Sequence, residues 1–166
     1  PGRLPIPPRM TTTKAKGSLL SCVLDVGIII NYSIADMGLN TLFRFYCNPS
    51  GNPAALTFGC AAGIIYEHSS SNTYTLHSFP LVFILQKHFV ISPVEIFMEI
   101  AIGPAFNYEL MPVSYSSFTF AVEAGAGCTY MISDYFRAGL FFNIYINNIL
   151  ERIPRPFLGI RGSFVF

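Results

Sequence analysis

Charged residues are scarce in this chain of 166 residues. Asp, Glu, Lys and Arg make up 11% of it, whereas an average soluble domain contains about 25%. Hydrophobic residues make up 52% and indicate contact with lipid, yet no apolar run reaches the ~20 residues that a membrane-spanning helix needs. The best uncharged window, residues 45–66, contains two Asn-Pro pairs. A hydrophobic chain without helical spans, rich in Gly, Phe and Tyr, is typical of a membrane β-barrel.

The sequence also lacks the spacings that bind metals or nucleic acids. It has no C-x-x-C motif and no closely paired histidines, so we expect no metal and no cofactor. Cys22, Cys60 and Cys128 fall on the apolar faces of separate predicted strands, which favours small apolar side chains over disulfides. A net charge of +1 without a basic stripe argues against a nucleic-acid partner.

The clearest pattern is the alternation in residues 117–130, SFTFAVEAGAGCTY. Apolar and aromatic residues alternate with small or polar ones, and this period of two predicts a strand. A helix would bring Glu123 round to the aromatic side. The stretch exceeds the ~5–6 residues of an ordinary strand and covers the ~9–11 that a tilted strand needs to cross a bilayer. We therefore interpret it as one strand of a transmembrane barrel.

The same alternation recurs along the chain and predicts an all-β fold. We expect an eight-stranded antiparallel up-and-down transmembrane β-barrel domain over residues 17–166, preceded by a flexible, Pro-rich lead-in over residues 1–16. The stretch 47–54 gives the strongest turn signal, and another turn is expected at 86–93. Pro80 removes a backbone donor from the fourth strand, whose facing stays open. The predicted strands are 18–32, 37–46, 56–67, 74–85, 94–108, 117–130, 136–146 and 157–166.

The mid-strand charges all fall on the polar register of their strands. A soluble lipocalin-type barrel would turn its apolar face inward, but here that face is aromatic and continuous over seven strands, so we place it in lipid. The charges then lie in a lumen that eight strands make just wide enough for side chains to fill, and opposite signs are expected to pair. The predicted lumen charge network is Asp25, Arg44, Glu95, Glu99, Glu123, Arg137 and Arg161.

The second half of the chain contains the segment 124–127 (AGAG), Tyr130, Asp134, Arg137 and the terminal Phe166. With these residues it resembles the small outer-membrane β-barrel superfamily that includes the OmpA transmembrane domain, OmpX and OmpW, and the first half fits only by pattern. The resemblance implies the outer membrane of a diderm bacterium, with the signal peptide absent from this sequence. It also implies that Phe164 and Phe166 belong to a signal read by the outer-membrane barrel assembly machinery.

Fold does not set function, so several functions are weighed. The leading hypothesis is a structural or surface-interaction role in adhesion or host contact. Its partners would be outer-membrane lipid, the assembly machinery and a host or surface ligand at the loops 33–36, 68–73, 109–116 and 147–154. The alternative, implied by the resemblance to OmpW, is a narrow channel for small solutes gated by switching ion pairs. A helical membrane protein and a soluble β-sandwich or lipocalin are the alternative folds.

A remote alternative is an enzyme that modifies lipid A. Some small barrels use a His-x-Ser pair near the outer rim, and residues 66–72 (YEHSSSN) contain this spacing. There, Glu67 would polarise His68 and so activate a serine. Because H-x-S is common and a polar loop explains the stretch, we expect no enzymatic activity and no catalytic residue. His77 and His88 are expected to lie at the membrane interface.

Overall fold

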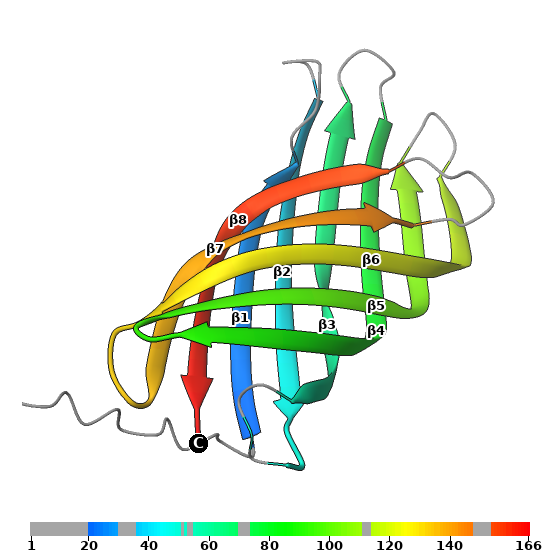
Figure 1. The fold of residues 1–166 in the computed structure, drawn as a ribbon. Helices are drawn as coiled ribbons and strands as arrows, with labels where there is room; N and C mark the ends of the chain where they lie inside the picture. Colours follow the sequence, from blue (N-terminus) through cyan, green and yellow to red (C-terminus); the bar gives the residue numbers. More distant parts are fainter. Residues whose placement is uncertain are drawn as a thin grey trace, which may run out of the picture.

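The structure is a computed structural model that describes residues 20–29, 36–50, 52, 55–69, 74–110, 114–147 and 154–166. Consecutive strands pair antiparallel, and β1 pairs with β8 to close a barrel (Figure 1). The predicted eight-stranded up-and-down barrel is confirmed. No helix that could span a membrane occurs among these residues. The strands are β1 (Leu20–Ile29), β2 (Asp36–Cys47), β3 (Leu56–Ser69), β4 (Tyr74–Ile91), β5 (Val94–Leu110), β6 (Tyr115–Met131), β7 (Phe136–Ile146) and β8 (Arg155–Val165).

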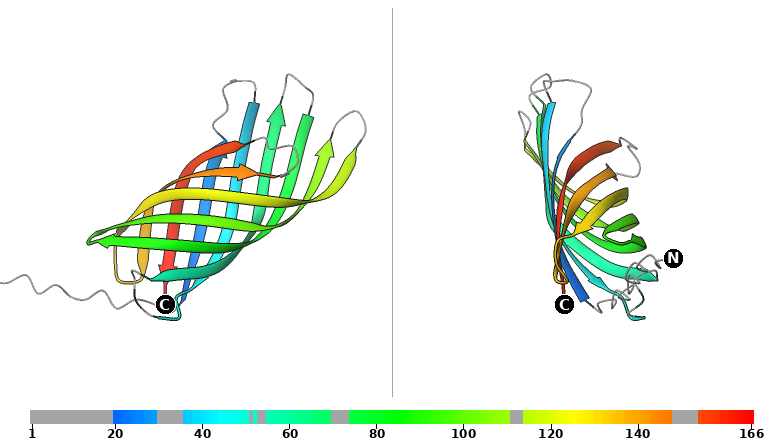
Figure 2. Two further views of the ribbon diagram at one scale, coloured as in Figure 1. Left: turned by 45° about the vertical axis from the view of Figure 1, so that its right-hand side comes forward. Right: turned by 60° about the vertical axis from the view of Figure 1, so that its left-hand side comes forward.

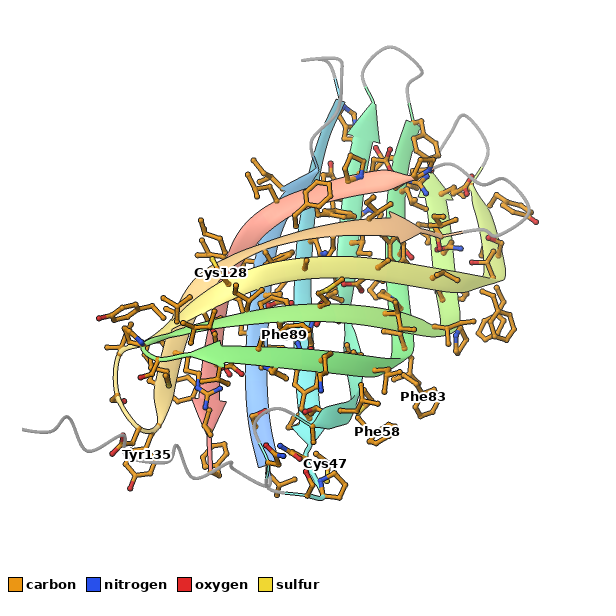
Figure 3. The ribbon with its side chains drawn as sticks, viewed as in Figure 1. Cys47, Phe58, Phe83, Phe89, Cys128 and Tyr135 are labelled. Atoms are coloured by element: carbon orange, nitrogen blue, oxygen red, sulfur yellow. The ribbon has the colours of Figure 1, made fainter. Side chains whose placement is uncertain are left out.

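Side chains alternate strictly between the lumen and the outer face. In β5, Phe97 is 1% exposed and its neighbour Met98 is 57% exposed. Figure 3 shows Phe58, Phe83 and Phe89 pointing away from the barrel. Because large apolar residues cover the outside while the buried charges lie inside, the outer face suits lipid and not water. This polarity contradicts the soluble lipocalin alternative.

Strand β4 is longer than the sequence predicted. It continues to Ile91, so the predicted turn at 86–93 is wrong, and only Ser92 and Pro93, joined by a cis peptide bond, connect it to β5. The polar run at 86–88 divides between the two faces of the strand: Gln86 is buried in the lumen and Lys87 faces outward. Pro80 faces the lumen, and residues 79 and 80 have no described pair with β3, although the register is the same on either side of them.

Several residues expected in loops belong to strands. β3 includes His68, β5 includes Glu109, and β6 begins at Tyr115. Asp36 is the first residue of β2, and Asn147 follows β7 directly. Of the predicted loops, residues 33–35, 70–73, 111–113 and 148–153 lie outside the described residues, as does the predicted lead-in 1–16.

The two ends of the barrel differ. The turn end carries the short connections 92–93 and 132–135 and the C-terminus, as Figures 1 and 2 show. The opposite end is called the loop end. Strand lengths differ: β3, β4, β5 and β6 have 14, 18, 17 and 17 residues, whereas β7 and β8 have 11 each. The described pairs of β6 with β7 stop at Val122, so residues 115–121 pair with β5 alone. The long strands therefore form a wall that extends past β7.

Candidate functional site: an ion-pair network that fills the lumen

A cluster of five charged side chains crosses the middle of the lumen. Arg44 from β2 reaches three carboxylates, with Nε 2.5 Å from Asp25 Oδ2, Nη2 2.5 Å from Glu123 Oε1 and Nη1 3.2 Å from Glu99 Oε1. Arg161 from β8 binds Asp25 at 2.6 and 2.7 Å and Glu99 Oε1 at 2.9 Å. All five side chains are at most 3% exposed. The cluster links β1, β2, β5, β6 and β8 across the lumen.

Neutral donors complete the coordination of the carboxylates. Tyr46 donates its hydroxyl to Glu99 Oε2 at 3.0 Å, and Gln86 donates Nε2 to the same oxygen at 2.8 Å. Asn143 donates Nδ2 to Glu123 Oε1, which Arg44 also holds. Buried charges are stable only when such hydrogen bonds replace the lost water. Glu123 Oε2 has no hydrogen-bond partner within the described residues.

Aromatic rings hold Arg161 in place, and glycines make room for them. The Arg161 guanidinium lies 4.0 Å from the centre of the Phe97 ring and 5.7 Å from that of Phe141, within range of cation–π attraction. A Cβ atom on Gly27 would meet the Phe141 ring at 3.0 Å. A Cβ atom on Gly127 would collide with Phe97. The small residues on the polar register therefore admit the rings beside the cluster.

A second ion-pair group lies near the turn end. Glu95 pairs with Arg137 and with His88, whose Nε2 lies 2.6 Å from Gln86 Oε1. This group borders a cavity of about 60 Å³, whose inner part is lined by Tyr46, Phe97 and Arg161. The cavity therefore reaches the central cluster from the turn end.

Uncharged polar side chains form a hydrogen-bonded group across the lumen toward the loop end. Asn147 donates Nδ2 to Asn107 Oδ1 at 2.7 Å, and Asn107 donates Nδ2 to Thr119 Oγ1 at 2.8 Å. Ser78 Oγ lies 3.4 Å from both Asn147 Oδ1 and the Tyr145 hydroxyl. Arg155 and Glu67 form another ion pair, with each side chain 13% exposed. These contacts tie β7 to β4, β5 and β6 across the lumen.

The structure places the seven residues of the predicted charge network in the lumen but divides them between two groups. Asp25, Arg44, Glu99, Glu123 and Arg161 form the central cluster, and Glu95 and Arg137 belong to the group at the turn end. Sequence reasoning missed the Glu67–Arg155 pair and the roles of His88 and Gln86. Glu67 already stood on the polar register, but residue 155 preceded the predicted start of the last strand.

Among the described residues, the outer face holds neither the Glu67–His68 pairing of the remote enzyme alternative nor a metal site. Glu67 points inward to Arg155, whereas His68 is on the outer face, with its Nδ1 3.0 Å from Thr75 Oγ1. The carboxylate therefore does not polarise this histidine. Cys47, Cys60 and Cys128 are exposed free thiols on the outer face, and Figure 3 shows Cys47 and Cys128. Within the described ranges, no three His, Cys, Asp or Glu side chains gather to hold a metal ion.

Solved structures show the same architecture. The chain is similar to the Neisserial surface protein A (NspA), with a TM-score of 0.58 and 12% identity over 89% of this chain and 96% of that one. It is similar to the N-terminal β-barrel domain of Pseudomonas aeruginosa OprF, with a TM-score of 0.57 and 13% identity over 90% and 99% of the two chains. The chain has the fold of the small outer-membrane β-barrels.

A third structure, Ail, the attachment invasion locus protein of Yersinia pestis, matches with a TM-score of 0.54 and 9% identity over 88% of this chain and 95% of that one. No protein-family model and no curated protein matches the sequence. The resemblance to small outer-membrane barrels is therefore confirmed for the fold, which the alternation of lipid-facing and lumen-facing residues specifies at low sequence identity.

Proposed function

We propose that this protein is an outer-membrane β-barrel of a diderm bacterium that contacts other surfaces through its loop end and does not transport solutes. The observation that carries this proposal is the lumen itself. Arg44 and Arg161 are bound from several sides by buried carboxylates, and the Asn107–Thr119–Asn147 contacts cross the lumen toward the loop end. A lumen filled by paired side chains has no room for a solute.

The wall formed by the long strands supports a role in surface contact. Residues 115–121 of β6 extend past the described pairs with β7, and the wall carries exposed Tyr115 and Phe118. Aromatic side chains of this kind are enriched where proteins bind one another. NspA is described as a surface protein and Ail as an attachment protein, which supports a host or surface ligand at this end. No enzymatic activity is proposed.

Planar-bilayer recording tests the closed lumen. Purified protein that migrates as a folded barrel on an unheated gel is expected to give no stepwise conductance above that of the empty bilayer. A charge-removing variant, Arg161→Leu with Asp25→Leu, serves as a positive control because it takes both groups from the central cluster. Regular conductance steps from the wild-type protein would contradict the proposal.

The second candidate function is a narrow OmpW-like channel, which the cavity at the turn end favours. This cavity is lined by Arg161. The lumen would open if the ion pairs of Arg44 and Arg161 with the buried carboxylates rearranged. Uptake of small solutes into vesicles that hold the wild-type protein separates the two functions. Uptake that Arg44→Met changes would establish the channel.

A further inference from the structure

The outer face of the strands is nearly free of nitrogen-bearing side chains. At the outward positions of the eight strands described, only His68, His77 and Lys87 carry side-chain nitrogen. All three lie on the neighbouring strands β3 and β4. Lys87 lies near the turn end, whereas the two histidines lie near the loop end, where β3 ends and β4 begins.

Register and side-chain contacts bring the two histidines together on one patch. His68 pairs with Thr75, and His77 pairs with Tyr66 on one side and with Tyr108 on the other. His68 Nδ1 lies 3.0 Å from Thr75 Oγ1, which leaves its Nε2 for a ligand. The His77 ring meets Tyr66 edge to face, with 5.2 Å between ring centres. These contacts restrict both rings before any ligand binds, which lowers the entropy cost of binding.

The patch lies at the boundary of the apolar surface. One step toward the turn end on the outer face, Phe79 and Phe106 form a cross-strand pair whose side chains are 42% and 45% exposed. Toward the loop end, the outward residues of β3 and β4 become polar, with His68 and Thr75. Tyrosine beside such a boundary is typical of the level of lipid headgroups. The histidines therefore lie where acyl chains give way to headgroups.

We propose that His68 and His77, assisted by Tyr108, bind the phosphate monoester of a lipid headgroup in the leaflet at the loop end, with Thr75 holding the His68 ring through Nδ1. Ring N–H and hydroxyl groups are donors that a phosphate accepts from. The described outward positions of the strands carry no Asp or Glu to repel the anion, and Phe79 and Phe106 receive the acyl chains of the same lipid. This inference goes beyond the proposed surface contact, because it concerns lipid bound to the side of the barrel.

Nitrogen NMR can test the site, because the protein has three histidines. The chain is labelled with ¹⁵N-histidine, refolded into uncharged detergent micelles and titrated with phosphatidic acid, and the signals are assigned with single His→Gln variants. We expect the His68 and His77 ring signals to shift. His88, paired with Glu95 in the lumen, is the internal control and keeps its signal. Diacylglycerol with the same acyl chains shifts none of the three.

Native mass spectrometry supplies the quantitative arm. Loss of the two histidines in H68Q/H77Q weakens retention of phosphatidic acid about tenfold, as expected for the loss of donors to a charged group. Phe142→Ala is the matched control, because Phe142 is an outward aromatic residue on β7, 42% exposed, and β7 pairs with none of the strands that carry the site. It keeps wild-type retention.

Three outcomes would overturn the proposal: histidine signals that ignore phosphatidic acid, equal shifts with inorganic phosphate alone, or wild-type retention by the double variant. Mobility on an unheated gel is recorded for every variant, so loss of the barrel is distinguished from loss of the site. Failure here leaves the closed lumen and its conductance test unaffected.

Discussion

Arg44 is the residue on which the central cluster depends most. It contacts carboxylates from three other strands, and its side chain is completely buried. Arg44→Met keeps an unbranched stem but removes the guanidinium group, which leaves Asp25, Glu99 and Glu123 with only Arg161 to balance them. Removing one partner from buried ions costs ~3–5 kcal/mol. We expect a loss of this size in the free energy of unfolding, measured as the fraction of folded band on unheated gels across a urea series.

Arg155→Met is the matched control for that prediction. The chemistry is the same, but the Glu67–Arg155 pair is partly exposed, and water compensates an exposed ion pair to within about 1 kcal/mol. Equal losses in the two variants would show that burial does not set the cost. Adding Glu123→Gln to Arg44→Met should recover part of the loss, since it removes one unbalanced charge.

Two glycines of β8 allow the effect of lumen packing on stability to be measured apart from the effect of strand propensity. A Cβ atom on Gly159 would meet the Phe141 ring and the backbone of Gly27 at 2.6 Å, whereas one on Gly162 meets nothing closer than 3.8 Å. Gly159→Ala should therefore destabilise the barrel by ~1–3 kcal/mol, the usual cost of overpacking. Gly162→Ala should leave stability unchanged or slightly raised. The same urea series measures both, and identical effects would contradict the packing argument.

At the scale of the element, the C-terminal strand combines packing with the proposed assembly signal. Phe164 packs against Phe136 with 4.9 Å between ring centres, whereas Phe166 is 73% exposed and its backbone N–H bonds to Leu20 O at 3.0 Å. Phe166→Ala should therefore lower the amount of folded protein in the outer membrane of cells and leave refolding into detergent unchanged. Phe164→Ala should impair both. Equal cellular amounts of Phe166→Ala and wild-type protein would remove the signal.

Strand β4 shows where the alternation of apolar and polar residues stops predicting the extent of a strand. Lipid outside and a packed lumen inside force a period of two, so the faces of the other seven strands could be predicted from the sequence alone. The period weakens at 86–88, because Gln86 and His88 serve the lumen groups while Lys87 faces outward near the turn end. Three polar residues in a row therefore hide the alternation that marks the rest of the strand. The alternation of apolar and polar residues that predicts a strand is least regular at the ends of the barrel, where both faces of the strand approach water.

Spin labels at consecutive positions of β4 test its unexpected length. Cysteine is introduced singly at positions 85 to 89 in a variant whose native cysteines are replaced by serine or alanine, and each site is labelled. Labels at 85, 87 and 89 should be accessible to oxygen dissolved in lipid, and labels at 86 and 88 should be shielded. Accessibility that does not alternate would restore the predicted turn.

Which charges meet could not be predicted from the strands one at a time. Asp25 and Arg161 are register partners of β1 and β8, a pair that exists only because the first and last strands close the barrel. Arg44 and Glu123 come from β2 and β6, which share no ladder, and they meet across the lumen. Such pairs depend on closure and on the stagger of all eight strands, properties of the whole molecule that no local pattern contains.

The pairing of β1 with β8, which closes the barrel, is a property of the whole molecule that can be tested directly. A closed barrel has no unpaired edge, which makes it resistant to SDS, so unheated protein should migrate apart from boiled protein. Ile160→Pro removes a donor from β8, where Ile160 pairs with Val26 of β1 and Leu140 of β7. It should abolish the difference in mobility, whereas Ile160→Ala, which keeps the backbone donor, should retain it. Equal mobility of heated and unheated wild-type protein, with a helical circular-dichroism spectrum, would contradict the barrel. Every assignment of a side chain to lumen or lipid depends on that closure.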